Sequence, residues 1–274
     1  MVSHSGLLTV IERAARKVAP QLRRDFGEVQ HLQVSRKGPA DFVTIADKKA
    51  EDTLVAELRK ARPDWGFLLE EGGEIEGDPM KPRWVIDPLD GTTNFLHGIP
   101  HFAISIAVQE PHRSGQGWGE VTTGLIYQPI LDETYWAEKS RGAWRHDQRL
   151  RVSARRDLTE AVIATGIPFI GHGDFSEWSR IFGAVAPSIA GIRRFGSAAL
   201  DLAWVASGRY DGFWESGLSP WDVQAGILLV REAGGFVTDF RGGAEVVERR
   251  QVLAANDVLH SKLHKLVAGA LRNA

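Results

Sequence analysis

The chain has 274 residues, of which 43% are hydrophobic, 29 are Gly and 12 are Pro, and this composition excludes a disordered tail or a fibrous repeat. Its 33 basic and 35 acidic residues give a formal net charge of −2, which argues against a globally basic nucleic-acid binder or a polycationic membrane binder. The chain has no Cys, so disulfides, thiolate zinc sites and a cysteine nucleophile are excluded, and a reducing compartment is expected.

The first sixty residues carry the apolar spacing of two helices. The pattern predicts a first helix over residues 5–19, whose end Pro20 limits, and a second over residues 42–61, which stops near Pro63. Thr44 is the N-cap candidate of the second helix. No apolar run approaches the roughly 20 residues of a membrane span, and no secretory signal is recognised. We therefore expect a cytoplasmic protein with no membrane partner.

From residue 66 the chain changes to short runs rich in β-branched and aromatic residues, which predict strands. These runs lie at residues 66–69, 83–86, 101–108, 124–127 and 134–138. After residue 160 strands and helices alternate, with strands at 161–165, 192–195 and 211–214 and helices at 175–188, 197–207, 220–233 and 257–271. The polar segment 240–251 predicts a loop or hairpin.

This order predicts an α/β fold with an α+β layered arrangement, in which layers of helices alternate with mixed β-sheets. We find no internal repeat and no long linker. The expected organisation is a single domain over residues 1–274. Its two possible lobes, 1–155 and 156–274, would share one core.

The strand predicted at residues 83–86 runs into two acidic residues and a glycine turn, Asp87-Pro88-Leu89-Asp90-Gly91. Pro88 stiffens this turn and Gly91 lets the backbone approach a ligand closely. Two carboxylates and the Leu89 carbonyl could converge on one cation, and the amides that open a following helix would suit a phosphate. Because acids beside an anion site need cations between them, the pattern favours hard divalent metals with oxygen ligands, Mg²⁺ first among them.

Each acidic residue considered alone also has a structural interpretation. Asp90 could form an ordinary turn, Glu70 a solvated loop end, and Asp222 or Asp47 a helix cap. What favours a site is that these acids all lie at the ends of predicted elements, where α/β folds build their sites. The acids concerned are Asp47, Glu70, Glu71, Asp87, Asp90 and Asp222.

With these motifs the chain resembles the inositol monophosphatase family of Mg²⁺-dependent, lithium-sensitive phosphatases. The central signature is WVIDPLDGTTNFLHGIP at residues 84–100. The other matches, in order and spacing, are Lys37 with DFVTIAD (41–47), the Glu pair (70–71), GLIYQP (124–129), RRFGSAALDLAWVASGRYDGFWE (193–215) and SPWDVQAGILLVREAGG (219–235). They cover nearly the whole chain. The resemblance implies the family's layered sandwich, and we expect a homodimer.

The resemblance implies two to three Mg²⁺ ions per site. Glu70, Asp87 and the Leu89 carbonyl would hold the first ion, and Asp87, Asp90 and Asp222 the second. Glu70, also counted among the catalytic residues, would reach a third, weaker ion through water. Two such metals can activate a water on one side of phosphorus and neutralise the leaving oxygen on the other, so no covalent nucleophile is needed.

The resemblance also assigns the residues that meet substrate and water. Gly91 and Thr92 would present amides to the phosphate, and the Thr92 hydroxyl and Asp47 would orient and deprotonate the attacking water. Ala198 and Glu215 would touch the sugar or polyol, although Glu215 alone could be a solvated strand end. The chain departs from the family at Leu69, where Gly is frequent. We expect metal binding to survive this change and the approach to Glu70 to differ.

Several weaker signals have structural interpretations. Ser197 lacks the surroundings of a serine nucleophile and is predicted to cap a helix. Trp221 is expected to pack beneath Asp222, and Lys37 either helps to balance charge or is a solvated loop lysine. The nine His residues show no metal-ligand spacing.

The leading functional prediction is Mg²⁺-dependent hydrolysis of myo-inositol monophosphate. Similar proteins act on fructose 1,6-bisphosphate, histidinol phosphate, nucleotide 3′-phosphates or NADP, and Glu215 with the short spacing favours inositol phosphate. A different class of function is binding in a ribosomal RNA transcription complex, for which the doubled arginines at 155–156, 193–194 and 249–250 are the only support. The near-neutral charge counts against binding as the sole function.

Overall fold

Apolar side chains alternate between the two faces of the long strand at Arg83–Asp90. Trp84 and Ile86 join one hydrophobic cluster, whereas Val85 joins another. Successive side chains of a strand point to opposite faces, so a strand with buried apolar residues on both faces must be covered on both sides. The core is therefore built in layers.

The computed structural model describes residues 4–28, 34–36, 42–112, 114, 117–168 and 173–272, with the backbone alone at 34–36 and 42–44. The helices are α1 (Gly6–Gly27), α2 (Ile45–Ala61), α3 (Thr92–Leu96), η2 (Leu158–Glu160), α4 (Phe175–Val185), η3 (Ala186–Ser188), α5 (Ala198–Ala206), α6 (Pro220–Glu232) and α7 (Asp257–Arg272). The strands are β1 (Val34–Arg36), β2 (Phe42–Thr44), β3 (Gly66–Leu69), β4 (Gly73–Ile75), β5 (Arg83–Asp90), β6 (Ala103–Pro111), β7 (Trp118–Gln128), β8 (Glu133–Glu138), β9 (Gly142–Arg145), β10 (Gln148–Arg149), β11 (Val162–Thr165), β12 (Gly191–Arg193), β13 (Gly212–Ser216), β14 (Phe236–Thr238) and β15 (Gln251–Ala255).

These strands form two large sheets, and both are mixed. The first has eight strands in the order β10-β9-β8-β7-β6-β5-β3-β4, in which only the β3–β5 pair is parallel within the described residues. The second has the order β12-β11-β13-β15-β14, with parallel pairs on both sides of β11. β1 and β2 form a small antiparallel sheet. The predicted layering with mixed sheets is confirmed.

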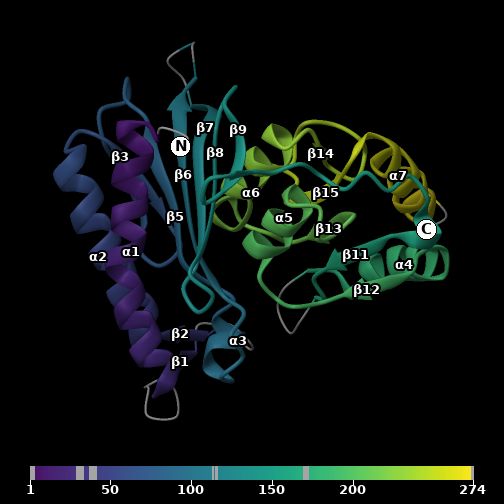
Figure 1. The fold of residues 1–274 in the computed structure, drawn as a ribbon, viewed down its shortest axis with the longest axis horizontal. Helices are drawn as coiled ribbons and strands as arrows, with labels where there is room; N and C mark the ends of the chain where they lie inside the picture. The colour runs from purple at the N-terminus through teal and green to yellow at the C-terminus, as the bar shows by residue number, and fades with distance from the viewer. Residues whose placement is uncertain are drawn as a thin grey trace.

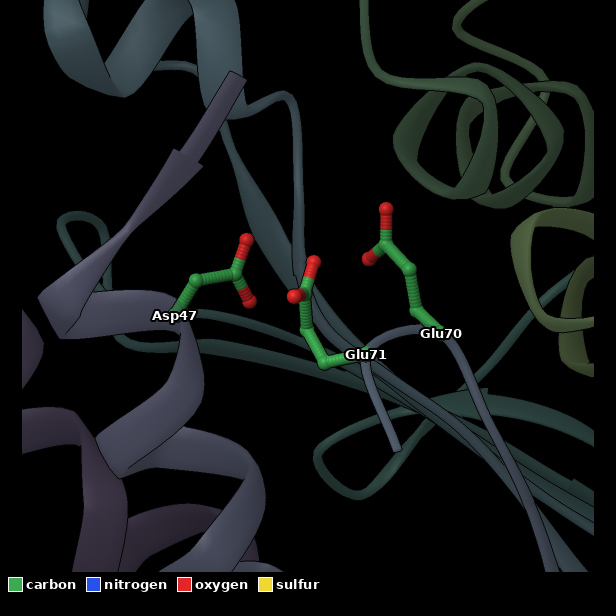
Figure 2. Close-up of side chains that lie close together, drawn as sticks. All are labelled: Asp47, Glu70 and Glu71. Atoms are coloured by element: carbon green, nitrogen blue, oxygen red, sulfur yellow. The ribbon is translucent and has the colours of Figure 1, made fainter. Parts of the chain in front are cut away.

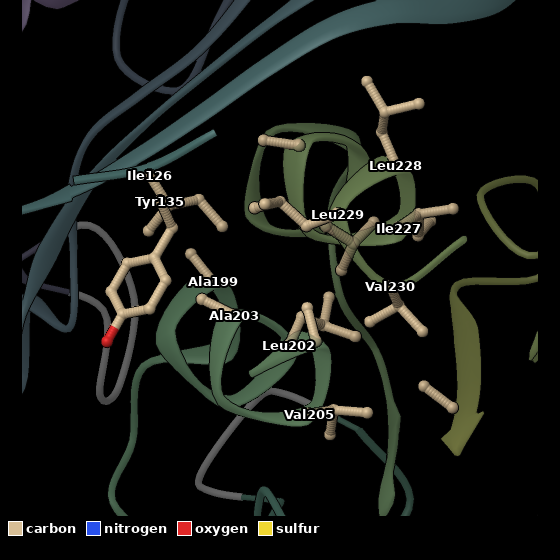
Figure 3. Packing of buried hydrophobic residues seen from close by; sticks show 14 of the residues in the cluster. Ile126, Tyr135, Ala199, Leu202, Ala203, Val205, Ile227, Leu228, Leu229 and Val230 are labelled. Atoms are coloured by element: carbon tan, nitrogen blue, oxygen red, sulfur yellow. The ribbon is translucent and has the colours of Figure 1, made fainter. Parts of the chain in front are cut away.

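Helices cover both faces of each large sheet (Figure 1). α1 and α2 pack on the outer face of the eight-stranded sheet, and α4 and α7 pack on the outer face of the five-stranded sheet. α5 and α6 fill the space between the two sheets, where apolar side chains of both helices meet those of β7 and β8 (Figure 3). The middle layer therefore connects the sheets through one hydrophobic cluster.

The first helix does not end at Pro20. α1 runs on to Gly27 with Pro20 inside it, which corrects the predicted end at residue 19. The apolar stripe continues through Leu22, which is fully buried against α2 and the sheet, while Pro20 itself is exposed. Packing of the apolar stripe keeps the helix continuous. Proline has no N–H to donate to the carbonyl one turn earlier, and on the exposed side of the helix water can donate to that carbonyl instead.

The second helix begins later than predicted. Residues 42–44 form β2, so α2 starts at Ile45 instead of residue 42, because β2 pairs with β1. The side chain of Thr44, the predicted N-cap, lies outside the described part of the chain. The short strands β4, β9 and β10 were not predicted, since two to four residues carry too little pattern.

The second half of the chain follows the predicted alternation as far as α6, but β14 and the interior strand β15 were not predicted. The polar segment 240–251 connects the antiparallel strands β14 and β15, as expected of a hairpin loop. The first large sheet ends at Arg149 and the second begins at Val162, so the boundary suggested near residue 155 falls between them; the division into lobes stays a prediction. Among the described helices, none combines the length and the hydropathy that crossing a membrane requires.

Candidate active site with a carboxylate cluster

The end of β5 is irregular, and its acidic residues lie where the regular pairing with β6 is interrupted. The pairing of β5 with β6 shifts register between Asp87 and Asp90. One Asp87 oxygen accepts the amide of Leu89 at 2.9 Å, which closes the turn locally. Gly91 follows with φ of 98°, and a Cβ there would lie 3.0 Å from the carbonyl oxygen of His101. The turn thus requires glycine for both its conformation and its close packing.

Asp90 is oriented by the start of α5. Its Oδ2 accepts the Ser197 hydroxyl at 2.5 Å and the Ala199 amide at 2.8 Å. Ser197 is also the N-cap of α5 and accepts the Leu200 amide at 3.4 Å, so its predicted capping role is confirmed. Two elements that are distant in sequence therefore position one carboxylate.

Asp222 occupies the third position of α6, and its Oδ2 accepts the Ser219 amide at 2.7 Å. The capping interpretation of this residue is correct, yet its carboxylate also borders the pocket that Asp90 and Gly91 line. The preceding residue, Trp221, is held at its carbonyl by the Ser105 hydroxyl at 3.1 Å. Capping and membership of the site are compatible in this residue.

Glu70 and Glu71 leave β3 and point toward Asp47 of α2 (Figure 2). One carboxylate oxygen from each of the three residues lies within 4.8 Å of those of the other two, the spacing of a possible metal site. Glu51 of α2 holds the turn that follows β3, because its Oε2 accepts the Glu71 amide at 2.9 Å. Leu69, the departure from the family pattern, is buried in the core.

The electrostatics of these acids are dominated by burial and by one another. Desolvation and then the neighbouring acids raise the pKa of Glu70 and of Asp87 well above the ordinary carboxyl value. The pKa of Asp222 is raised to about 7 by desolvation and by Asp90. Desolvation raises the pKa of Asp90 to about 6, against the hydrogen bonds it accepts. Without a cation the cluster holds protons more tightly than isolated carboxyls do.

The cluster fits a hard divalent cation by its donor chemistry. Every candidate ligand is an oxygen, from carboxylates or from the Leu89 carbonyl. Glu70 Oε2 is buried and has no hydrogen-bond partner among the described residues, which is costly for a carboxylate unless an ion binds it. The acids that share electrostatic contacts are Asp47, Glu70, Asp87, Asp90 and Asp222.

Thr92 lies between the turn and Asp47. Its hydroxyl donates to the Leu89 carbonyl at 3.0 Å and lies 3.5 Å from Asp47 Oδ2. Asp47 is fully buried, although the sequence also allowed a helix-capping role for it. The hydroxyl and the carboxylate that resemblance assigned to water activation are thus brought together.

A pocket of about 190 Å³ adjoins the cluster, and Thr92, Ala198 and Glu215 line it. Glu215 faces this pocket rather than bulk solvent, and desolvation, followed by Asp222 and Asp90, raises its pKa to about 8. A Cβ at Gly166 would come within 1.8 Å of Glu215 Oε1, so the carboxylate fits only because this residue is glycine.

Sequence reasoning missed three residues here. Glu71 was placed among the acids at element ends without a role of its own, and Glu51 was not considered, although its i+4 spacing from Asp47 placed it on the same helix face. Arg194 lines the pocket and was considered only for nucleic-acid binding, and Gly166 carried no signal. Lys37 and Asp41 lie outside the described residues, so their expected place near the site stays a prediction.

Comparison with known proteins gives consistent matches. Residues 4–274 match the inositol monophosphatase family. A Mesorhizobium japonicum protein named inositol-1-monophosphatase is 52% identical over 266 residues, covering 97% of each chain. A Pseudomonas aeruginosa protein named Nus factor SuhB is 44% identical over 254 residues, covering 91% of each. The crystal structure of extragenic suppressor protein suhB from Bartonella henselae is similar with a TM-score of 0.90 and 50% identity, covering 96% of this chain and 98% of that one.

Proposed function

The chain belongs to the inositol monophosphatase family, and we propose that it is a Mg²⁺-dependent phosphomonoesterase that hydrolyses myo-inositol monophosphate to inositol and phosphate. The observation that carries the proposal is the convergence of acids from α2, β3, β5 and α6 beside one small pocket. Relatives at about half identity over nearly the full chain bear the name inositol-1-monophosphatase.

The metal ligands we propose are Glu70, Asp87, the Leu89 carbonyl, Asp90 and Asp222. Asp87 lies in the centre of the electrostatic contacts and is the natural bridging carboxylate, since Glu70, Asp90 and Asp222 all act on it. Two to three Mg²⁺ ions bound by this set would polarise the phosphate and lower the pKa of a coordinated water.

The proton of the attacking water would pass to Asp47. Thr92 Oγ1 already donates to the Leu89 carbonyl, so its lone pairs are left to accept a hydrogen bond from water. Asp47 Oδ2, 3.5 Å from this hydroxyl, is close enough to take the proton as a general base once bound cations favour its ionised form.

The pocket would hold the two ends of the substrate differently. Gly91, Thr92 and Thr93 line it with the first residues of α3, where phosphate oxygens can meet backbone amides. Among the other lining residues, Glu215 can accept hydrogen bonds from ring hydroxyls, and Ala198 leaves room for the ring.

The test is a panel of esters assayed with Mg²⁺ and again after chelation. The panel contains myo-inositol 1-phosphate, fructose 1,6-bisphosphate, histidinol phosphate, a nucleotide 3′-phosphate, NADP and p-nitrophenyl phosphate. We expect the highest kcat/KM on inositol phosphate and none without metal. Equal rates across the panel would still support a phosphatase but would refute the inositol assignment. Full activity after chelation would refute the metal mechanism. Li⁺ should inhibit, as the family resemblance implies.

A second candidate function is suggested by the relatives named Nus factor SuhB. The doubled arginines give it little support: Arg155 pairs with Asp211, Arg249 pairs with Asp239, and Arg194 lines the pocket. Binding to ribosomal RNA leader transcripts, measured by mobility shift in the presence and absence of Mg²⁺, distinguishes this role from catalysis.

We propose a homodimer that uses the outer face of α4. Phe175 and Phe182 are exposed there, and both rings stack against Trp178 between them. The adjacent strand β12 is an edge of its sheet. Light scattering should give twice the chain mass for the wild type, and Phe182→Glu should shift it toward the monomer. A location in the cytoplasm stays a prediction.

A further inference from the structure

A second pocket, of about 310 Å³, opens beside the C-terminal half of α6. It lies between that helix, the β6–β7 hairpin and residues 244–248, and it shares no lining residue with the pocket of the proposed active site. Its volume is in the range of small-molecule sites. The question is which ligand its walls would accept.

The inner walls are apolar. Ile227 and Leu228 of α6 are only 7% and 6% exposed, and Val246 packs with them in the central core. Trp118 stands at the side of the pocket, with the Arg83 guanidinium 4.2 Å from the centre of its ring. A flat apolar group would therefore find a rigid wall, because Trp118 is already held in place.

Three of the charged residues that line this pocket, Glu120, Lys139 and Glu232, are engaged, whereas Arg231 and Glu248 form no ion pair within the described residues. Lys139 forms an ion pair with Glu120, and Glu232 accepts the amides of Ser140 and Gly142, each at 2.8 Å. Arg231 forms no ion pair with any carboxylate of the described residues, and its closest acceptor is the Val237 carbonyl at 3.5 Å. Its guanidinium is left to bind an anion.

The neighbouring acids restrict which anion that is. Glu120, Glu232 and Glu248 line the same pocket, so a doubly charged phosphate would be repelled. A single carboxylate carries half the charge of such a phosphate. It can also accept two parallel hydrogen bonds from the planar guanidinium.

Two glutamine side chains line the pocket, and only one of them has its hydrogen bonds satisfied within the described residues. The amide of Gln109 is engaged on both sides, accepting from Arg83 and donating to the Gly119 carbonyl, each at 3.0 Å. Gln224 also lines the pocket, and its buried Oε1 has no hydrogen-bond partner among the described residues. Since buried polar atoms are nearly always paired, a small side-chain rearrangement that admits a ligand N–H or O–H would satisfy it.

We propose that this pocket binds a small molecule with a flat apolar body, one carboxylate and one polar hydrogen. The apolar body lies between Trp118 and α6, the carboxylate pairs with Arg231, and the polar hydrogen reaches Gln224. The site is independent of the proposed phosphatase activity, because it needs neither metal nor phosphate ester.

Indole-3-acetate has all three features and is the probe for the test. We expect saturation-transfer NMR and titration calorimetry on the metal-free full chain to show binding at millimolar concentration or below. Arg231→Gln keeps most of the side-chain stem and should weaken the probe at least about tenfold, the loss expected for one charge-assisted pair. Arg180→Gln, an exposed arginine on α4, is the matched control and should bind as the wild type does.

Two comparisons keep the result specific. 3-Methylindole, which lacks the carboxylate, should bind the wild type about tenfold more weakly than indole-3-acetate does. It should bind the wild type and Arg231→Gln with equal affinity. Val247→Trp should block the pocket while leaving ester hydrolysis unchanged. The proposal is overturned if indole-3-acetate does not bind at 10 mM or so, if Arg231→Gln binds it as tightly as the wild type, or if inorganic phosphate displaces it.

Discussion

Buried carboxylates occur in two regions of this protein, and what differs is their neighbours. Asp211, 2% exposed before β13, accepts the Val162 amide at 2.8 Å and the Arg155 guanidinium at 3.2 Å. Asp87, equally buried at the end of β5, has mainly other acids around it.

Asp239, in the segment that connects β14 and β15, resembles Asp211 in being a buried carboxylate surrounded by hydrogen-bond donors. It accepts the amides of Arg241 and Gly243 at 2.8 and 2.9 Å and pairs with Arg249 at 3.3 Å. A buried carboxylate among donors holds the fold together, whereas one among acids opposes it and is retained for what it binds. The same substitution, Asp to Asn, should therefore have opposite consequences in the two regions.

The largest effect is expected from Asp90→Asn. Removal of one proposed metal ligand should lower kcat/KM on the order of a thousandfold, because a metal ligand is worth several kcal/mol and each 1.4 kcal/mol or so is tenfold. The metal-free variant should melt no lower than the wild type, since the substitution relieves repulsion between acids. Loss of activity together with a lower melting temperature would place Asp90 among the structural carboxylates instead.

The next effect concerns the residues that would activate water. Thr92→Ala and Asp47→Asn should each lower kcat about a hundredfold with little change in KM, because general-base positioning acts in the transition state while metals and amides still hold phosphate. Steady-state kinetics on inositol 1-phosphate measures both constants. A rise in KM at constant kcat would contradict the assignment.

Glu215→Gln should lower kcat/KM for inositol 1-phosphate about ten- to a hundredfold, because an amide group replaces the carboxyl group that would accept from the ring hydroxyls. Hydrolysis of p-nitrophenyl phosphate, which has no ring hydroxyls, should fall much less. Glu248→Gln, outside this pocket, is the matched control. Equal losses on both esters would mean that Glu215 serves the metal cluster and not substrate choice.

On the structural side of the comparison, Asp211→Asn should cost about 2 kcal/mol of unfolding free energy, since an amide cannot replace both the ion pair and the buried acceptor. Urea denaturation measures this loss. Activity should stay at the wild-type level, in contrast to Asp90→Asn. A stable but inactive Asp211→Asn protein would break the distinction between the two regions.

The smallest effect is expected from pH. The pKa is raised to about 7 at Asp222 and to about 8 at Glu215, so in the metal-free protein the folded state favours their protonated forms. This contribution to stability is complete below the unfolded value near pH 4 and is lost as pH rises through 7 to 8 or so. The melting temperature in chelator should fall over that window by a few degrees, less in Asp222→Asn. A fall that Mg²⁺ does not reduce would argue against a shared cation site.

Much of the fold could be predicted because the pattern is local. Strand β5, the alternation from β11 to α6 and the starts of α5 and α6 follow from apolar periodicity and from capping residues such as Ser197 and Ser219. The errors occur where packing outweighs local preference. Pro20 does not end α1 because Leu22 is buried beyond it, and residues 42–44 pair as a strand before α2 begins.

The sequence by itself determined the candidate residues for the chemistry, since acids, a glycine turn and their spacing are visible in the chain order. Only the tertiary structure decided that Asp47, Glu70 and Glu71 meet, that Glu215 faces a pocket made possible by Gly166, and that Arg231 has no acidic partner among the described residues. The physical reason is that desolvation and charge pairing depend on neighbours in space, and neighbours distant in sequence are set by how layers pack.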